Sequence, residues 1–134
     1  MPLVAPLPPD HDPEIARLAM FFSGTLGFVP NSGLARMRRP ALARALTELN
    51  RAVMDSQGRV TSELKRLLGH VASRVAGCRD CLAHTVRAAE RFGAREAADA
   101  RRLEQAWQFR DSALFAPAEK AALEYAASGP TEAR

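Results

Sequence analysis

Residues 64–84 read Leu64-Lys-Arg-Leu-Leu-Gly-His-Val-Ala-Ser-Arg-Val-Ala-Gly-Cys-Arg-Asp-Cys-Leu-Ala-His84, and this segment is the most informative part of the chain about its architecture. Its apolar residues recur every three or four positions, which predicts an amphipathic helix from Ser62, or Thr61 beside it, to Gly77. A further helix is predicted to begin around Cys78 and to stop at Phe92–Gly93. Two cysteines therefore stand at the start of a predicted helix.

Proline and glycine mark the ends of the other predicted helices. These helices span Pro13 to Gly27, Pro40 to Gly58, Ala94 to Trp107 and Pro117 to Ser128. Asn31 or Ser32 is expected to cap a short turn between the first two. The helix from Pro40 carries an apolar stripe made of Leu42, Ala45, Leu46, Leu49 and Val53.

The whole pattern predicts an all-α bundle of about six helices, because no segment alternates apolar and polar residues with period two. The Pro-rich residues 1–11 are predicted to be an extended arm, since proline blocks helix formation. Residues 12–134 are predicted to form a single helical domain, and a chain of this length can bury a core without staples.

The charge pattern does not favour nucleic-acid binding. The net charge is +4, but the arginines are scattered among acidic residues along every segment, and the one dense group is Arg36, Arg38 and Arg39. No run approaches the roughly 20 apolar residues of a membrane span, and no secretory signal is recognisable. We therefore expect a cytoplasmic protein with neither a membrane nor a nucleic acid as partner. In such a protein, a C-x-x-C pair indicates redox or metal chemistry.

Cys78 and Cys81 lie on nearly the same helical face, because three residues turn a helix by about 300°. That spacing permits a disulfide to form and reopen. The helix start favours the thiolate, which is the nucleophilic form of cysteine. His84, three residues after Cys81, lies near the same face and can accept the thiol proton directly or through one water.

Other interpretations of the pair are weighed against this one. Both cysteines can be inert, buried small residues. Zinc can bind Cys78, Cys81 and His84 with His70 as a fourth ligand, but zinc ligands normally come from two separate elements and a second pair is missing. Covalent haem attachment needs His directly after the second Cys, where this chain has Leu82. The sequence therefore predicts no metal and no cofactor.

The Gly-Cys-x-x-Cys-x-x-His pattern after an amphipathic helix resembles the carboxymuconolactone decarboxylase / AhpD-like alkylhydroperoxidase superfamily. Gly27–Asn31, Arg39–Pro40 and Ala113–Leu123 fit its peroxidase-related branch, and the resemblance covers Ile15 to Ala126. It implies an AhpD-like helical bundle that assembles as a homotrimer or hexamer. It also implies reduction of a small-molecule hydroperoxide by a thiol pair, recharged by a thiol or lipoyl-type reductant.

By position, the resemblance makes Cys81 the peroxidatic cysteine, Cys78 the more exposed resolving cysteine and His84 the proton-relay histidine. The family's relay glutamate falls at Arg66, which stays protonated and cannot pass a proton, although its charge can stabilise a thiolate. Glu63 and His70 are the alternative relay groups. Asp80, between the cysteines, can raise the thiolate pKa or be a solvated surface acid.

Three functions follow from these observations. The leading one is a thiol-dependent peroxidase or disulfide redox protein. The alternative, prompted by Arg66, is a helical binding or assembly protein with weak or no peroxidase activity. Lactone decarboxylation is disfavoured, since that branch of the family generally lacks the cysteine pair. Of the remaining apolar residues, Trp107, Phe109 and Phe115 are expected in the core or at a subunit interface, and Met20, Phe21 and Phe22 partly at an oligomer contact.

Overall fold

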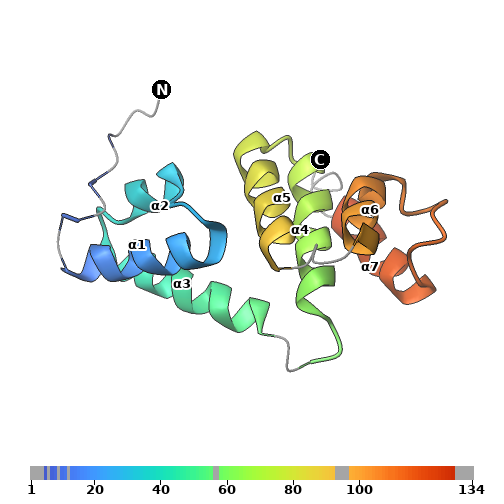
Figure 1. The fold of residues 1–134 in the computed structure, drawn as a ribbon, viewed down its shortest axis with the longest axis horizontal. Coiled ribbons are helices and arrows are strands. Elements are labelled where there is room, and N and C mark those ends of the chain that lie inside the picture. The colour runs from blue at the N-terminus through green and yellow to red at the C-terminus, as the bar shows by residue number, and fades with distance from the viewer. Residues whose placement is uncertain are drawn as a thin grey trace. The chain divides into compact units, whose positions relative to one another are not determined.

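The computed structural model describes residues 13–55, 58–92 and 97–128, together with Ala5, Leu7, Pro8, Asp10 and His11. Its helices are α1 (Pro13–Leu26), α2 (Asn31–Arg36), α3 (Pro40–Met54), α4 (Ser62–Val75), α5 (Arg79–Phe92), α6 (Ala97–Gln105) and α7 (Pro117–Ser128), with a 3-10 turn at Ala106–Gln108 (Figure 1). No strand occurs in these ranges, so the all-α prediction is confirmed. The additional helix is α2, where a short turn was expected.

The chain divides into two compact units, residues 1–55 and 56–134, and each is described by itself. The prediction of a single domain over residues 12–134 stays a prediction. Much of the predicted arm, namely residues 1–4, 6 and 9, lies outside the described residues. Two described arm residues contact the helical part of this unit: the Arg38 guanidinium donates to the Ala5 carbonyl at 2.9 and 2.7 Å, and Leu7 packs on the core.

In the first unit, α1 buries one apolar face against α2, α3 and the turn between them. Its core consists of Ile15, Leu18, Ala19, Met37 and Ala43. Gly27 has φ 83° and ends α1, a left-handed conformation that glycine adopts at little cost. The Thr25 hydroxyl donates to the Phe21 carbonyl one turn back at 2.9 Å, so the last turn of α1 is also bonded through a side chain.

The predicted apolar stripe of α3 is largely exposed in this chain. Leu42, Leu49 and Val53 are 47%, 59% and 53% exposed, whereas Ala43 and Thr47 are buried. The reason is that α3 packs against α1 with the face that carries Ala43, so the stripe of larger side chains lies outside this contact. The Thr47 hydroxyl on the same face donates to the Ala43 carbonyl at 2.8 Å. Met20 on α1 is also exposed.

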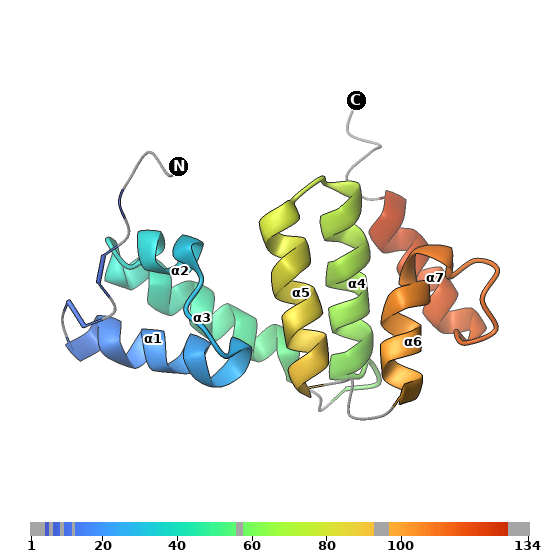
Figure 2. The same ribbon diagram turned by 45° about the horizontal axis from the view of Figure 1, so that its top comes forward.

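In the second unit, α4 is the central helix, with α5 on one side and α7 on the other (Figure 2). Its core residues are Leu67, Val71, Ala106, Phe109, Phe115 and Leu123. Burying one such large side chain contributes about 1.5–3 kcal/mol, so this cluster fixes α4 against α7. Phe109 and Phe115 are therefore core residues as predicted, while Trp107 is 42% exposed, with the Arg74 guanidinium 4.5 Å from its ring centroid.

Candidate functional site

The link between α4 and α5 is fixed by main-chain hydrogen bonds. The Gly77 N–H donates to the Arg74 carbonyl at 3.1 Å, and the Cys78 N–H donates to the Ser73 carbonyl at 3.0 Å. This is the Schellman pattern of helix ends, and it needs the left-handed backbone that Gly77 adopts at φ 68°. Gly77 therefore sets the point at which the chain turns back and delivers Cys78 to the next helix.

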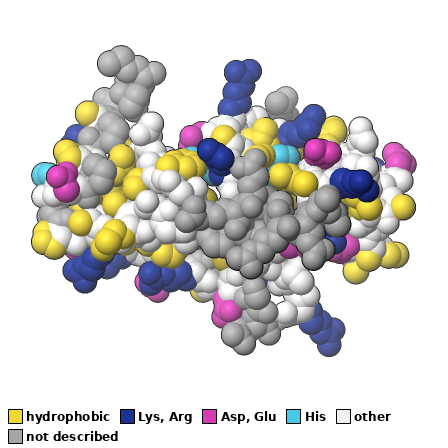
Figure 3. Space-filling view, in the orientation of Figure 1, with side chains coloured by type: hydrophobic (Ala, Val, Ile, Leu, Met, Phe, Trp, Pro, Cys, Tyr) yellow, Lys and Arg dark blue, Asp and Glu magenta, His cyan; other side chains and the backbone are white. Residues whose placement is uncertain are grey.

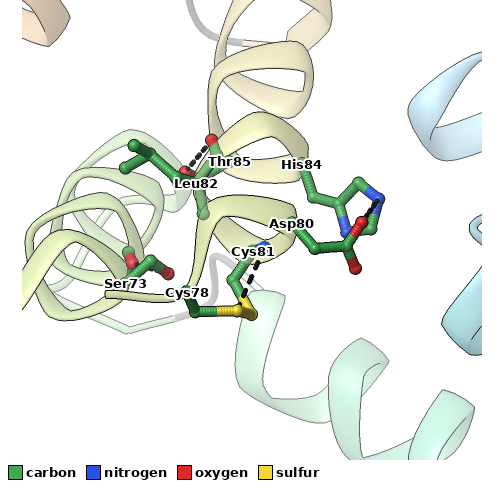
Figure 4. Close-up of a disulfide and its surroundings, with 8 residues drawn as sticks. Ser73, Cys78, Asp80, Cys81, Leu82, His84 and Thr85 are labelled. Atoms are coloured by element: carbon green, nitrogen blue, oxygen red, sulfur yellow. Dashed lines mark hydrogen bonds and ion pairs between the residues drawn. A yellow bond between two sulfur atoms is a disulfide. The ribbon is translucent and has the colours of Figure 1, made fainter. Parts of the chain in front are cut away.

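Cys78 also caps the start of α5. Its carbonyl accepts the Leu82 N–H at 2.9 Å. Its sulfur accepts the Cys81 N–H at 3.3 Å, as Figure 4 shows. The first N–H groups of a helix have no partner within the helix and form its positive end. The Cys78 sulfur takes the place of the usual Ser or Asp oxygen in that role.

The two cysteines form a disulfide with their Cα atoms 5.3 Å apart, inside the usual range for such bonds. The geometric premise that the two sulfurs can join is therefore confirmed. Their exposure is the reverse of what the resemblance implied: Cys81 is exposed and Cys78 is partly buried. The reason is local, because Cys78 lies in the tight junction beneath the last turn of α4, whereas Cys81 lies on the open side of α5.

His84 faces an acid from the cysteine motif. Its Nε2 lies 3.6 Å from Oδ1 of Asp80, one helical turn earlier on α5, and Figure 4 shows the ring turned toward that carboxylate. The histidine side chain is 21% exposed and that of Asp80 is 64% exposed. A contact between the His84 ring and the Cys81 sulfur stays a prediction.

His70 is buried on α4 and held by α5. Its Nδ1 lies 3.2 Å from the Thr85 hydroxyl, which donates its own proton to the Leu82 carbonyl at 2.8 Å. The histidine must therefore donate from Nδ1, leaving Nε2 as the acceptor. Burial lowers the pKa of His70, and the charge of Arg74 lowers it further, so the ring is neutral at pH 7. Sequence reasoning missed the Thr85 partner, which only the packing of α4 on α5 reveals.

Glu63 lies at the start of α4 and pairs with a residue of α6. Its Oε1 lies 3.0 Å from Arg102 Nε on α6, and Arg102 also binds Glu119 on α7. At 1.5 Å rise per residue, about 18 Å of helix separate Glu63 from Val75 at the end nearest the cysteines. Glu63 therefore joins helices far from the sulfurs, and its relay role stays a prediction.

Arg66 is partly buried on α4, and burial lowers the pKa of its guanidinium. Arginine still carries its proton at neutral pH, so this residue can supply charge but cannot serve as a base.

Three further properties limit the kinds of site that the described residues can form. Over the described residues, no three His, Cys, Asp or Glu side chains gather closely enough to hold a metal ion, and none of the helices has the length and hydropathy to cross a bilayer. On the face drawn in Figure 3, Lys and Arg side chains are interrupted by apolar and acidic ones rather than gathered in one patch.

The described helices carry a cysteine pair that forms a disulfide at the first turn of α5. The chain belongs to the carboxymuconolactone decarboxylase family, whose model matches residues 40–128. The family resemblance predicted from the sequence is thereby confirmed.

Two solved structures of the debrominase Bmp8 are similar to this chain. The apo structure is 29% identical with a TM-score of 0.84, covering 96% of this chain and 67% of that one. A cysteine-to-alanine variant in complex with 2,3,4-tribromopyrrole is 28% identical with a TM-score of 0.84, covering 96% and 66%. The chain thus spans about two thirds of the length of the debrominase. No curated protein matches the chain.

Proposed function

We propose that this protein is a thiol–disulfide oxidoreductase that reduces a small-molecule hydroperoxide with Cys78 and Cys81. The single observation that carries the proposal is the disulfide between these residues at the amino end of α5. A pair that closes within one helical turn can store and release two electrons without moving the fold. The family membership supports the same chemistry.

The exposed Cys81 is the sulfur that an external molecule reaches, which supports its assignment as the attacking thiolate. Attack on the terminal peroxide oxygen breaks the O–O bond, leaves a sulfenic acid on Cys81 and releases an alcohol after one proton is taken up. The Cys78 thiol then displaces water from the sulfenic acid and forms the disulfide. A thiol or lipoyl-type dithiol returns both cysteines to the reduced state by exchange.

His84 is proposed as the group that takes the Cys81 proton and returns it to the leaving oxygen. The proposed setting is cytoplasmic, where reductants keep thiol pairs cycling. The proposed assembly is a homotrimer or hexamer, and the exposed Met20 and Leu49 supply apolar surface that such an assembly can cover.

The test is peroxide consumption by the reduced protein with a dithiol reductant. Cys81→Ser is expected to abolish turnover, while Cys78→Ser is expected to allow one oxidation event and then stop. Ser73→Ala is the matched control, because its hydroxyl donates only to the Gly69 carbonyl at 2.6 Å within α4. Consumption by Cys81→Ser at the wild-type rate ends the proposal.

A second candidate is reductive removal of a halogen from an aromatic ring, favoured by the likeness to Bmp8 and its complex with a brominated pyrrole. The balance closes without another reductant: an aryl bromide and two thiols give the arene, one disulfide and hydrogen bromide. Incubating the reduced protein with 2,3,4-tribromopyrrole is then expected to release one bromide per disulfide formed. Bromide release without peroxide turnover selects this function. Failure of both reactions leaves the alternative of a binding or assembly protein.

A further inference from the structure

The acid between the two cysteines, Asp80, is placed to act on His84. The two side chains lie one turn apart on α5, with Oδ1 and Nε2 3.6 Å apart (Figure 4). Asp80 belongs to the first turn of the helix, where a carboxylate is favoured by the positive helix end. Asp80 therefore lies between the two cysteines of the disulfide, and His84 lies one turn further along α5.

Several other acids of the second unit are engaged elsewhere. Glu63 and Glu119 share Arg102, and Glu124 binds Arg110 at 2.6 and 2.7 Å. Arg66 is a cation and cannot orient an imidazole by accepting its proton. Asp80 places a carboxylate oxygen 3.6 Å from the His84 ring.

We propose that Asp80 is a positioning residue for His84 in the thiol chemistry, an inference that rests on the proposed function. A carboxylate facing Nε2 favours the tautomer with the proton on that nitrogen, which leaves Nδ1 as the acceptor for a thiol proton. The same carboxylate stabilises the imidazolium that forms when the proton arrives. Asp80 thereby supplies, from inside the cysteine motif, a carboxylate partner for the histidine.

The sign of the effect separates this role from a direct action on the sulfurs. A negative charge beside a cysteine disfavours its thiolate, so removing a carboxylate that acts only on the sulfurs speeds thiol oxidation. Removing one that acts through His84 slows it. The two accounts thus predict opposite changes for Asp80→Asn.

The experiment measures the rate at which the reduced protein reacts with hydrogen peroxide and, separately, with an aromatic disulfide that releases a coloured thiol. Asp80→Asn is expected to slow both reactions about two- to fivefold, as fits an exposed pair, and Asp80→Glu to restore much of the rate. In a His84→Gln background, Asp80→Asn is expected to have no further effect. Asp111→Asn, an exposed acid beside Arg110, is the matched control.

A spectroscopic measurement needs neither oxidant. Nitrogen NMR of the His84 ring at pH 8 in the oxidised protein is expected to show a smaller share of the Nε2–H tautomer in Asp80→Asn than in the wild type. The inference is overturned if Asp80→Asn reacts at the wild-type rates and has the wild-type tautomer share. It is also overturned if Asp80→Asn slows the reactions equally with His84 present and in the His84→Gln background. The reduced protein can fail to react with peroxide while Asp80→Asn still slows the reaction with the aromatic disulfide and changes the His84 tautomer share. That result would reject the peroxidase proposal and retain the role of Asp80.

Discussion

The two sides of α4 use different physical means to hold their neighbours. Toward α5, the junction is set by main-chain hydrogen bonds around Gly77 and by the sulfur of Cys78. Toward α6 and α7, the contact is a buried apolar cluster around Phe109, with Arg102 bridging acids on two helices. One side of the helix is therefore fixed by a buried apolar cluster with ion pairs, whereas the other ends in a main-chain turn that places the disulfide at the start of α5.

The largest loss of stability is expected from Phe109→Ala, in the apolar cluster between α4 and α7. This ring is 1% exposed, and removing a buried phenylalanine costs about 3–5 kcal/mol of unfolding free energy. Urea unfolding measures the loss. Leu114→Ala, at a site 38% exposed, is the control and is expected to cost less than about 1 kcal/mol. Equal losses for the two variants would contradict the assignment of the core.

The turn between α4 and α5 is tested by Gly77→Ala. The left-handed backbone at φ 68° costs an alanine about 1–2 kcal/mol, although open space surrounds the added methyl group. The free energy of unfolding, measured in urea, is expected to fall, and the disulfide is expected to close more slowly. Gly58→Ala also enters open space, but without the left-handed backbone, so it is expected to be neutral. A neutral Gly77→Ala would show that the junction does not depend on glycine.

The ion pair between Arg102 and Glu119 is expected to make the free energy of unfolding depend on pH. Burial raises the pKa of Glu119, but the Ala116 N–H and Arg102 outweigh this, so the pKa lies below its ordinary value of 4.5. A depressed carboxyl pKa stabilises the fold above pH 4.5, and that stability is lost as the pH falls through the folded-state pKa. Arg102→Met is expected to cost about 1–2 kcal/mol at pH 7 and less at pH 3, measured by urea unfolding. A cost that does not change with pH would place the effect in packing alone.

The smallest effect is expected where α5 contacts α4 through a neutral hydrogen bond. Thr85→Val keeps the shape of the side chain but removes the acceptor of the His70 Nδ1–H, costing about 1 kcal/mol. Thr85→Ser retains the hydroxyl and is the control. Urea unfolding at pH 8, where His70 is neutral, makes the comparison. A loss in Thr85→Ser as large as in Thr85→Val would assign the effect to the methyl group.

Local signals in the sequence predicted several helix boundaries, although α3 ends at Met54, before the predicted end at Gly58, and the predicted start at Ala94 lies outside the described residues. Pro40 and Pro117 begin α3 and α7, the Thr61 hydroxyl accepts the Leu64 N–H at the start of α4, and Gly77 ends that helix. Each of these depends on a few adjacent residues, so the chain itself contains the information.

Features that depend on distant partners could not be predicted in the same way. The exposure of Leu49 follows from which face of α3 meets α1, and the pairing of Glu63 follows from where α6 brings Arg102. The contact between His84 and Asp80 could have been predicted, because side chains four residues apart meet on a helix. Periodicity alone does not say which of several helical neighbours a side chain selects.

The central claim is that Cys78 and Cys81 are a reversible redox pair. The most direct measurement is mass-spectrometric mapping of the bond between them in the reduced protein, after one equivalent of hydroperoxide, and again after added dithiol. The account predicts that the two peptides are separate, then linked with loss of two hydrogens, then separate once more. Two thiols that stay unlinked after peroxide, or that oxidise no faster than a free model thiol, would contradict it.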